Sequence, residues 1–236
     1  MKVFGVPIDN VSRADVLKQV ETWLEGDTFK RIATVNPEFL LLAKDNPNFR
    51  QSLLAADLRL ADGVGINLPF WLRGEHLIER FPGADLLTEV LRLAEEKGYT
   101  VGLALHDHGL SSPLQILAVL KEQYPKLHCS LYSETYHSTP ISYNLSPIIY
   151  HLLLSNYGAP LQELYLESLR EKNTGIRLAI GVGGAFDFMT GVRSRAPKWM
   201  QSIGLEWLWR LYQQPSRFNR IWNAVIVFPV KVLSQK

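Results

Sequence analysis

The chain has 236 residues, of which 47% are hydrophobic, and it carries a formal net charge of +2. A chain of this length can bury a core without staples, and its single cysteine, Cys129, excludes an internal disulfide. No apolar run reaches the length of a transmembrane helix, and the N-terminal segment lacks the apolar region of a signal peptide, so we expect a cytoplasmic protein.

Positive charge is concentrated at the C-terminal end. Residues 192–236 contain eight Lys or Arg and one acidic residue, Glu206, whereas the rest of the chain is net negative. The same segment holds four of the six tryptophans: Trp199, Trp207, Trp209 and Trp222. Cations mixed with indoles suit a lipid headgroup layer or nucleic acid. We therefore predict a core at 1–191 and a basic, Trp-rich docking appendage at 192–236.

Strand-like and helix-like patterns alternate through the first half of the chain. In order, they predict a strand at 31–35, a helix from Pro37, a short helix at 48–55, a strand at 58–61, a helix at 84–97 and a strand at 99–105. Asn36 before Pro37 is a helix N-cap followed by proline at the first helical position, and Gly98 is a C-terminal stop. This order is typical of βα units.

The second half continues the alternation. It predicts a helix from Pro113, a strand at 127–132, a loop at 133–147, a strand or buried helix at 148–154, a helix from Pro160 and a strand at 177–182. Pro229 is expected to break the last helix. The pattern favours an α/β fold with a Rossmann-like, open, mainly parallel sheet covered by helices on both faces.

Polar residues follow three of the predicted strands. Thr34 and Asn36 end the first, Asp62 ends the second, and Gly181 and Gly183 end the last. In open parallel sheets, ligands bind beyond the carboxyl ends of the strands, so these residues are expected to share one crevice. Asp62 is the candidate catalytic residue, although an Asp before Gly is equally typical of a turn.

Two familiar kinds of site have weak support. The Gly181-x-Gly183-Gly184 run resembles a dinucleotide fingerprint, but it lacks the third glycine and the acidic residue that should follow. No Asp-x-Asp, His-Glu-x-x-His or Cys-x-x-Cys motif occurs, so we expect neither a metal nor a cofactor.

Taken together, the motifs resemble the WecG/TagA/CpsF family of glycosyltransferases along nearly the whole chain. The matching stretches are Thr34-x-Asn36-Pro37-Glu38, Ala61-Asp62-Gly63-Val64-Gly65-Ile66, Arg80-x-x-Gly83-x-Asp85-Leu86, Gly158-Ala159-Pro160-x-Gln162-Glu163, Gly181 to Phe188, Arg195-Ala196-Pro197-x-Trp199, Gly204 to Arg210 and Pro215-Ser216-Arg217. The resemblance implies an inverting, metal-independent transfer of an N-acetylmannosamine-type sugar from a UDP-sugar to a sugar on a polyprenyl diphosphate.

The resemblance also implies a role for individual residues. Asp62 matches the family's general base, and an apolar surround could raise its pKa toward a useful value. The implied substrate-binding residues are Thr34, Asn36, Arg80, Gln162, Gly181 and Gly183. Arg210, Arg217 and Arg220 would bind the lipid diphosphate, and their helical spacing places them on one helix face. The protein would then work as a peripheral protein on the anionic inner face of the cell membrane.

Departures from the family pattern keep other donors open. His106-Asp107-His108-Gly109 replaces the usual glycine-rich nucleotide loop, and the stretch before Gly158 lacks the family's Asp. UDP-N-acetylmannosaminuronate, UDP-glucose or another hexose donor is therefore an alternative. A non-catalytic module that docks on a membrane or on RNA is a further reading, but mere docking would not require the polar crevice, and nucleic acid is not an expected partner.

Overall fold

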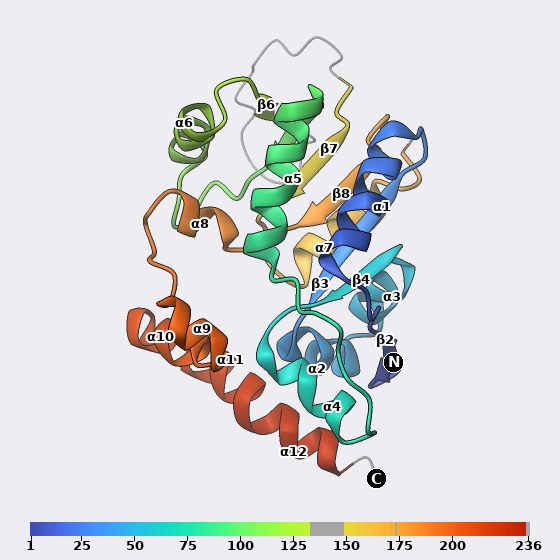
Figure 1. Ribbon diagram of the computed structural model, residues 1–236, viewed down its shortest axis with the longest axis vertical. Helices are drawn as coiled ribbons and strands as arrows, with labels where there is room; N and C mark the ends of the chain where they lie inside the picture. Colours follow the sequence, from blue (N-terminus) through green and yellow to red (C-terminus); the bar gives the residue numbers. More distant parts are fainter. Residues whose placement is uncertain (133–148, 173, 235–236) are drawn as a thin grey trace.

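The computed structural model describes residues 1–132, 149–172 and 174–234. In this part of the chain, six parallel strands form one sheet in the order β4-β3-β8-β7-β5-β6 (Figure 1). They are β3 (Lys30–Val35), β4 (Leu58–Ala61), β5 (Thr100–Ala104), β6 (His128–Leu131), β7 (Leu152–Ser155) and β8 (Leu178–Gly181). The predicted parallel α/β fold is confirmed.

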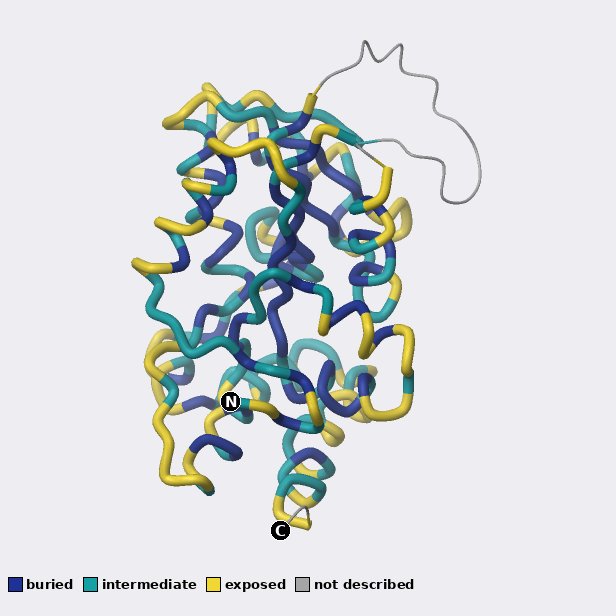
Figure 2. Tube along the Cα trace, turned by 90° about the vertical axis from the view of Figure 1, so that its right-hand side faces the viewer, coloured by how far each residue is buried: buried dark blue, intermediate teal, exposed yellow. Residues whose placement is uncertain are grey.

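Helices cover both faces of the sheet. One face packs against α1 (Arg13–Glu25), α5 (Gly83–Lys97), α6 (Pro113–Gln123) and α8 (Ala185–Met189), and the other against α2 (Pro37–Asp45), α3 (Pro47–Ala55) and α7 (Leu161–Ser168). Side chains alternate along each strand, so Leu152 and Leu154 are buried under the helices of the first face, whereas Leu153 is buried under those of the other face. Buried residues therefore run through the middle of the molecule (Figure 2).

Local sequence signals account for the helix ends. Asn36 caps α2 by accepting a hydrogen bond from the amide of Phe39 at 3.0 Å, and Ser112 forms a capping box with Gln115 at the start of α6. Gly98 ends α5 in the left-handed region, at φ 72°. The stretch at 148–154, predicted as strand or helix, contains β7; the predicted loop at 133–147 lies outside the described residues.

The two ends of the chain pack together. An N-terminal hairpin, β1 (Lys2–Val3) and β2 (Val6–Pro7), places the Phe4 ring 5.7 Å from the ring of Phe228, edge to face. This ring contact fixes the C-terminal helix against the N-terminal hairpin.

Two short elements follow β4: the 3₁₀ turn η1 (Val64–Ile66) and the helix α4 (Asn67–Trp71).

Residues 192–234 run along one side of the core as a chain of short helices (Figure 1). They are α9 (Lys198–Ser202), α10 (Glu206–Gln213), the 3₁₀ turn η2 (Pro215–Arg217), α11 (Phe218–Trp222), the π-helical turn η3 (Asn223–Val227) and α12 (Phe228–Leu233). Over the described ranges, no helix combines the length and the apolar character needed to cross a bilayer.

Two expectations about this segment are wrong. Arg210, Arg217 and Arg220 do not share one continuous helix, because Gln214 leaves the helical region, at φ −139° and ψ 79°, as residues before proline tend to do. Pro229 does not break the last helix. It lies in the first turn of α12, directly after the π-helical turn, where a missing N–H is tolerated.

Candidate active site

Asp62 lies directly after β4, at the carboxyl end of the sheet. Its amide donates to the carbonyl oxygen of Val35 at 2.8 Å, which extends the pairing of β4 with β3 by one residue. The next residue, Gly63, turns the chain with φ 79°, a conformation that favours glycine. The amide of Phe81 donates to the carbonyl oxygen of Ala61 at 3.0 Å, and this bond brings the segment containing Arg80 to the same strand end.

The surroundings of Asp62 make its carboxylate more basic than usual. Burial raises the pKa of Asp62 to about 6; the charge of Arg210 opposes this rise, and that of Glu206 adds to it. The Gly63 amide and the charge of Arg80 also lower the pKa by smaller amounts. The predicted direction of the shift is confirmed. A carboxylate of this kind is ionised at neutral pH and can still accept a proton from a substrate hydroxyl.

The appendage packs directly on the loop that carries Asp62. A Cβ atom on Gly65 would lie 2.7 Å from Cγ of Pro37 and 3.7 Å from the carbonyl oxygen of Ala224. A Cβ atom on Gly204 would lie 2.7 Å from Val64 Cγ2. These glycines permit the close approach by which α10 brings Arg210 and Glu206 to Asp62.

Thr34 and Asn36 flank the same strand end. Thr34 is 7% exposed in β3, and its Oγ1 would lie 3.4 Å from a Cβ atom on Gly83, at the start of α5. Asn36 is half-buried, and its Oδ1 is used in capping α2. Their contacts with a substrate stay predictions.

Gln162 holds two loops together at the neighbouring strand ends. Its Oε1 accepts hydrogen bonds from the amides of Gly183 at 3.1 Å and Gly158 at 3.4 Å, and its Nε2 donates to Glu163 at 3.1 Å. A Cβ atom on Gly181 would lie 2.0 Å from Nε2 of Gln162, so glycine is required there. Binding of substrate by Gln162, Gly181 and Gly183 stays a prediction, and the structure adds a positioning contact.

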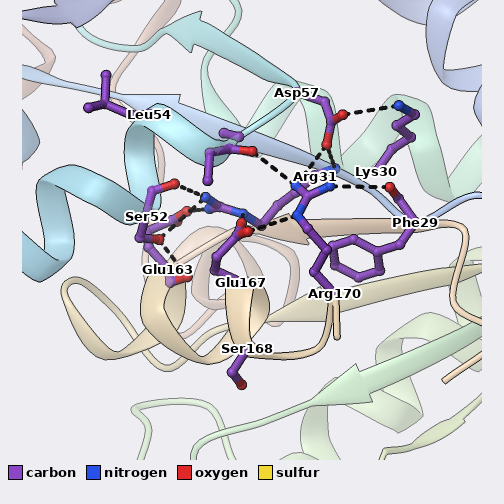
Figure 3. Close-up of polar contacts among 12 residues, drawn as sticks. Phe29, Lys30, Arg31, Ser52, Leu54, Asp57, Glu163, Glu167, Ser168 and Arg170 are labelled. Carbon is purple, nitrogen blue, oxygen red and sulfur yellow. Dashed lines mark hydrogen bonds and ion pairs between the residues drawn. The ribbon is translucent and has the colours of Figure 1, made fainter. Parts of the chain in front are cut away.

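Glu163, to which Gln162 donates, belongs to a buried polar network. Figure 3 shows this network around Arg31. The fully buried guanidinium of Arg31 donates to the carboxylates of Glu163 and Glu167, and to the carbonyl oxygen and hydroxyl of Ser52. Ser52 Oγ in turn donates to the carbonyl oxygen of Glu163 at 2.8 Å. Sequence reasoning gave Arg31 no role, since an arginine within an apolar strand pattern carries no signal of its partners.

The three predicted lipid-diphosphate arginines lie near one another despite the broken helix. Burial, together with the charges of Arg210, Arg220 and Arg193, lowers the pKa of Arg217 to about 10. Arg220 is engaged by a bidentate ion pair with Glu38, at 2.7 and 3.0 Å. Arg210 lies 5.8 Å above the centre of the Phe188 ring.

Arg193 and Glu206 are site residues that sequence reasoning missed. Arg193 is 8% exposed and belongs to the arginine cluster, and Glu206 faces Asp62. The only signals in the sequence are an Arg-x-Arg pair after Gly191 and a lone acid in a basic segment. Neither signal distinguishes these residues from solvated charges.

The described residues contain no group of three His, Cys, Asp or Glu side chains placed to hold a metal ion. Independence from metal stays a prediction. The unusual His106 loop is held at the ends of β5 and β7, where the amide of His106 donates to Asn156 Oδ1 at 2.6 Å. From β5 the chain continues to β6 on one side of the sheet, and from β7 it continues to β8 on the other side. Such a switch point in strand order is where ligands such as nucleotides bind in parallel sheets.

At the carboxyl end of an open parallel sheet, the site combines one buried carboxylate of raised pKa with the nearby Arg210 and Arg80, an arrangement compatible with group transfer. The chain belongs to the glycosyl transferase WecG/TagA/CpsF family, whose model matches residues 1–236. It is therefore a glycosyltransferase.

Two curated relatives come from Bacillus. Both are named N-acetylglucosaminyldiphosphoundecaprenol N-acetyl-beta-D-mannosaminyltransferase. The relative from Bacillus spizizenii is 29% identical over 205 residues, covering 85% of this chain and 77% of its own length. The relative from Bacillus subtilis is 28% identical over 194 residues, covering 80% of this chain and 74% of its own.

Proposed function

We propose that this glycosyltransferase moves N-acetylmannosamine from a UDP-sugar to N-acetylglucosamine on a polyprenyl diphosphate, in the synthesis of a cell-surface polysaccharide or teichoic-acid linkage unit. The names of the two Bacillus relatives support the acceptor and the transferred sugar. The observation that carries the proposal is the Asp62 carboxylate, with a pKa raised to about 6, at the carboxyl end of the sheet and beside Arg210 and Arg80.

In the reaction, Asp62 acts as general base. It takes the proton of the acceptor hydroxyl while that oxygen attacks the anomeric carbon, and the bond from this carbon to the UDP oxygen breaks. Attack from the face opposite UDP inverts the anomeric configuration. General-base assistance of this kind contributes about 10²- to 10⁴-fold to the rate.

The remaining predicted residues position the two substrates. Thr34, Asn36 and Gln162 offer groups for sugar hydroxyls and the N-acetyl group, and the backbone at Gly181 and Gly183 allows close approach. Arg80 would stabilise the charge that develops on UDP as it leaves. Arg210, Arg217 and Arg220 would hold the diphosphate of the acceptor through bidentate hydrogen bonds, without a metal.

The appendage would dock on the membrane that contains the lipid acceptor. Large apolar side chains are exposed along it: Trp199, Ile203, Leu208, Tyr212, Phe218, Trp222, Ile226, Val230 and Leu233. Phe218 and Trp222 stack, with ring centres 5.8 Å apart, next to Arg217 and Arg220. Aromatic rings beside cations suit the headgroup region of an anionic leaflet.

The test is a UDP-release assay with a panel of UDP-sugars and a short-chain polyprenyl-diphosphate N-acetylglucosamine acceptor. We expect release with UDP-N-acetylmannosamine, and a loss of about 10²- to 10⁴-fold in the variant Asp62→Asn. Release with a different donor only would replace the donor and keep the reaction. An Asp62→Asn variant with full activity would eliminate Asp62 as the base.

A further inference from the structure

Arg193 is a buried cation with two side-chain donors that no described residue accepts a hydrogen bond from. It follows α8, is 8% exposed, and its Nε and Nη1 atoms are buried without a hydrogen-bond partner among the described residues. Its ion-pair contact is with Asp187 Oδ2, at 3.6 Å from Nη1, which is beyond the usual hydrogen-bond distance. The other oxygen of Asp187 accepts from the hydroxyl and amide of Ser111, at 2.8 and 3.3 Å.

Arg31 shows what this chain does with a purely structural buried arginine. The guanidinium of Arg31 donates from Nε, Nη1 and Nη2 to oxygens of Glu167, Glu163 and Ser52. Because an unpaired buried donor is costly, such pairing is the rule for buried arginines. Arg193 departs from this rule among the described residues, which points to an acceptor supplied by a ligand.

Further cations converge on the same place. Nη1 of Arg193 and Nη2 of Arg210 lie 3.8 and 3.7 Å from the position that a Cβ atom on Gly184 would take, so the two guanidinium groups flank this glycine. Nε of Arg210 is also buried with no hydrogen-bond partner in the described part of the chain. Burial lowers the pKa of Arg193, Asp187 opposes this, and the charges of Arg210 and Arg220 lower it further.

An assembly of guanidinium groups that repel one another is suited to a ligand with several negative charges. Arginine forks match phosphate oxygens, and a diphosphate offers two sets of them to two neighbouring forks. Asp187 supplies one negative charge next to Arg193, so the cluster keeps an excess of positive charge.

We propose that Arg193 is a diphosphate-binding residue, which acts with Arg210 beside Gly184. The inference rests on the proposed function in one respect, because both substrates named there carry a diphosphate. The shared chemistry is the diphosphate group, and its source is either UDP or the lipid acceptor. Arg193 thus extends the arginine set of the appendage toward the end of β8.

The test measures binding, so that it is independent of whether the correct donor sugar is known. Calorimetric titrations of the full chain with UDP, with uridine and with a short-chain prenyl diphosphate are compared for the wild type, Arg193→Met and Arg193→Lys. Arg92→Met is the control, since Arg92 is an exposed arginine of α5 paired with Glu89 and Glu96. Thermal unfolding of each variant is recorded in parallel.

We expect Arg193→Met to lose at least tenfold in affinity for UDP or for the prenyl diphosphate, and Arg193→Lys to lose less. Loss confined to UDP assigns the donor diphosphate, and loss confined to the prenyl diphosphate assigns the acceptor. Uridine affinity and unfolding temperature should not fall in Arg193→Met, because the substitution removes a buried, poorly paired charge.

Three results overturn the proposal. They are unchanged affinity of both Arg193 variants for both diphosphates, a wild type that binds neither, and a fall in unfolding temperature without a change in affinity. Should Arg193→Met fail to fold, Arg193→Lys still decides, since loss of the fork lowers diphosphate affinity if Arg193 binds it. A wild type that binds a diphosphate but transfers no N-acetylmannosamine would overturn only the proposed function.

Discussion

Arg31 and Arg193 are both buried, yet the donors of Arg31 are paired with oxygens of the chain, whereas two donors of Arg193 have no hydrogen-bond partner among the described residues. Arg31, on β3, donates to two carboxylates and to Ser52, and Gln162 ties this network to the loops after β7 and β8. Arg193 meets Asp187 at 3.6 Å and otherwise faces like charges. The first arrangement stabilises the fold, and the second preserves positive charge for a ligand at the expense of stability.

The same contrast between a paired and an unpaired group holds for two buried carboxyl groups, those of Glu163 and Asp62. Burial raises the pKa of Glu163, and Arg31 and Gln162 oppose the rise by pairing with it. Burial also raises the pKa of Asp62, but the cations near Asp62 act at longer range, without a hydrogen bond from a guanidinium among the described residues. A carboxylate without a direct cationic partner remains available to take a proton from a substrate.

The largest expected effect on stability comes from Arg31→Met. This substitution leaves the buried Glu163 without its cationic partner, so we expect a loss of about 3–5 kcal/mol in the free energy of unfolding. Urea denaturation followed by circular dichroism measures it, with Arg92→Met as the exposed control, for which little change is expected because exposed ion pairs contribute little to stability. Equal stabilities of the two variants would show that Arg31 does not stabilise the fold.

Local signals in the sequence predicted the sheet and most helix ends. Proline and capping residues begin α2 and α6, Gly98 ends α5, and apolar runs mark the strands. These features act within a few residues, so a single sequence reveals them. In the last helices, Pro215 is a local signal for the break at Gln214, which helical spacing alone does not reveal, whereas the π-helical turn before Pro229 has no such signal in the sequence.

The site could be predicted only in part for the same physical reason. Asp62 is visible because it follows a strand at the edge where ligands bind. Arg193 and Glu206 become site residues only when the appendage packs on the core, through contacts such as that of Gly204 with Val64. No pattern along the chain encodes that approach, and motif resemblance supplied the roles of Arg210, Arg217 and Arg220.

The next largest effect tests the cost of burying Asp62. Its pKa is raised from 3.8 to about 6 on folding, so wild-type stability falls as the pH rises from about 4 to 6, and the full penalty is present above pH 6. We expect Asp62→Asn to be more stable than wild type at pH 8 by about 1–3 kcal/mol, with the pH-dependent part of this gain absent below pH 4.

Asp57→Asn is the control, because the pKa of Asp57 is shifted in the opposite direction to that of Asp62. Burial alone would raise the pKa of Asp57, but hydrogen bonds from Arg170, the Arg31 amide and Lys30 lower it overall. Its stabilising effect is therefore present at neutral pH and lost on acidification. Urea titrations of both variants at pH 4 and pH 8 should give pH-dependent changes of opposite direction; changes of the same direction would contradict the contrast between a paired and an unpaired carboxylate.

A smaller effect is expected on the pH dependence of transfer. Since Asp62 must be ionised to act as base, kcat/KM should rise with pH, with its midpoint near the pKa of about 6, and level off roughly one pH unit above it. Arg210→Met removes the largest charge that lowers the pKa of Asp62, so the midpoint of this rise should move upward by about one pH unit. Arg80→Met should move it less. A midpoint that neither variant shifts would show that a group other than Asp62 controls the profile.

The smallest effect concerns the exposed face of the appendage. Trp222 is 49% exposed beside Arg220, and transfer of part of its ring into the headgroup region should account for about a three- to tenfold change in membrane partitioning. Co-sedimentation of Trp222→Ser with vesicles rich in anionic phospholipid measures this change. Leu114→Ser is the matched control, because Leu114 is 73% exposed on α6, at the opposite end of the molecule from α12 (Figure 1). Equal partitioning of both variants would show that Trp222 does not contribute to membrane binding. Diphosphate binding would then remain as the role of the neighbouring arginines.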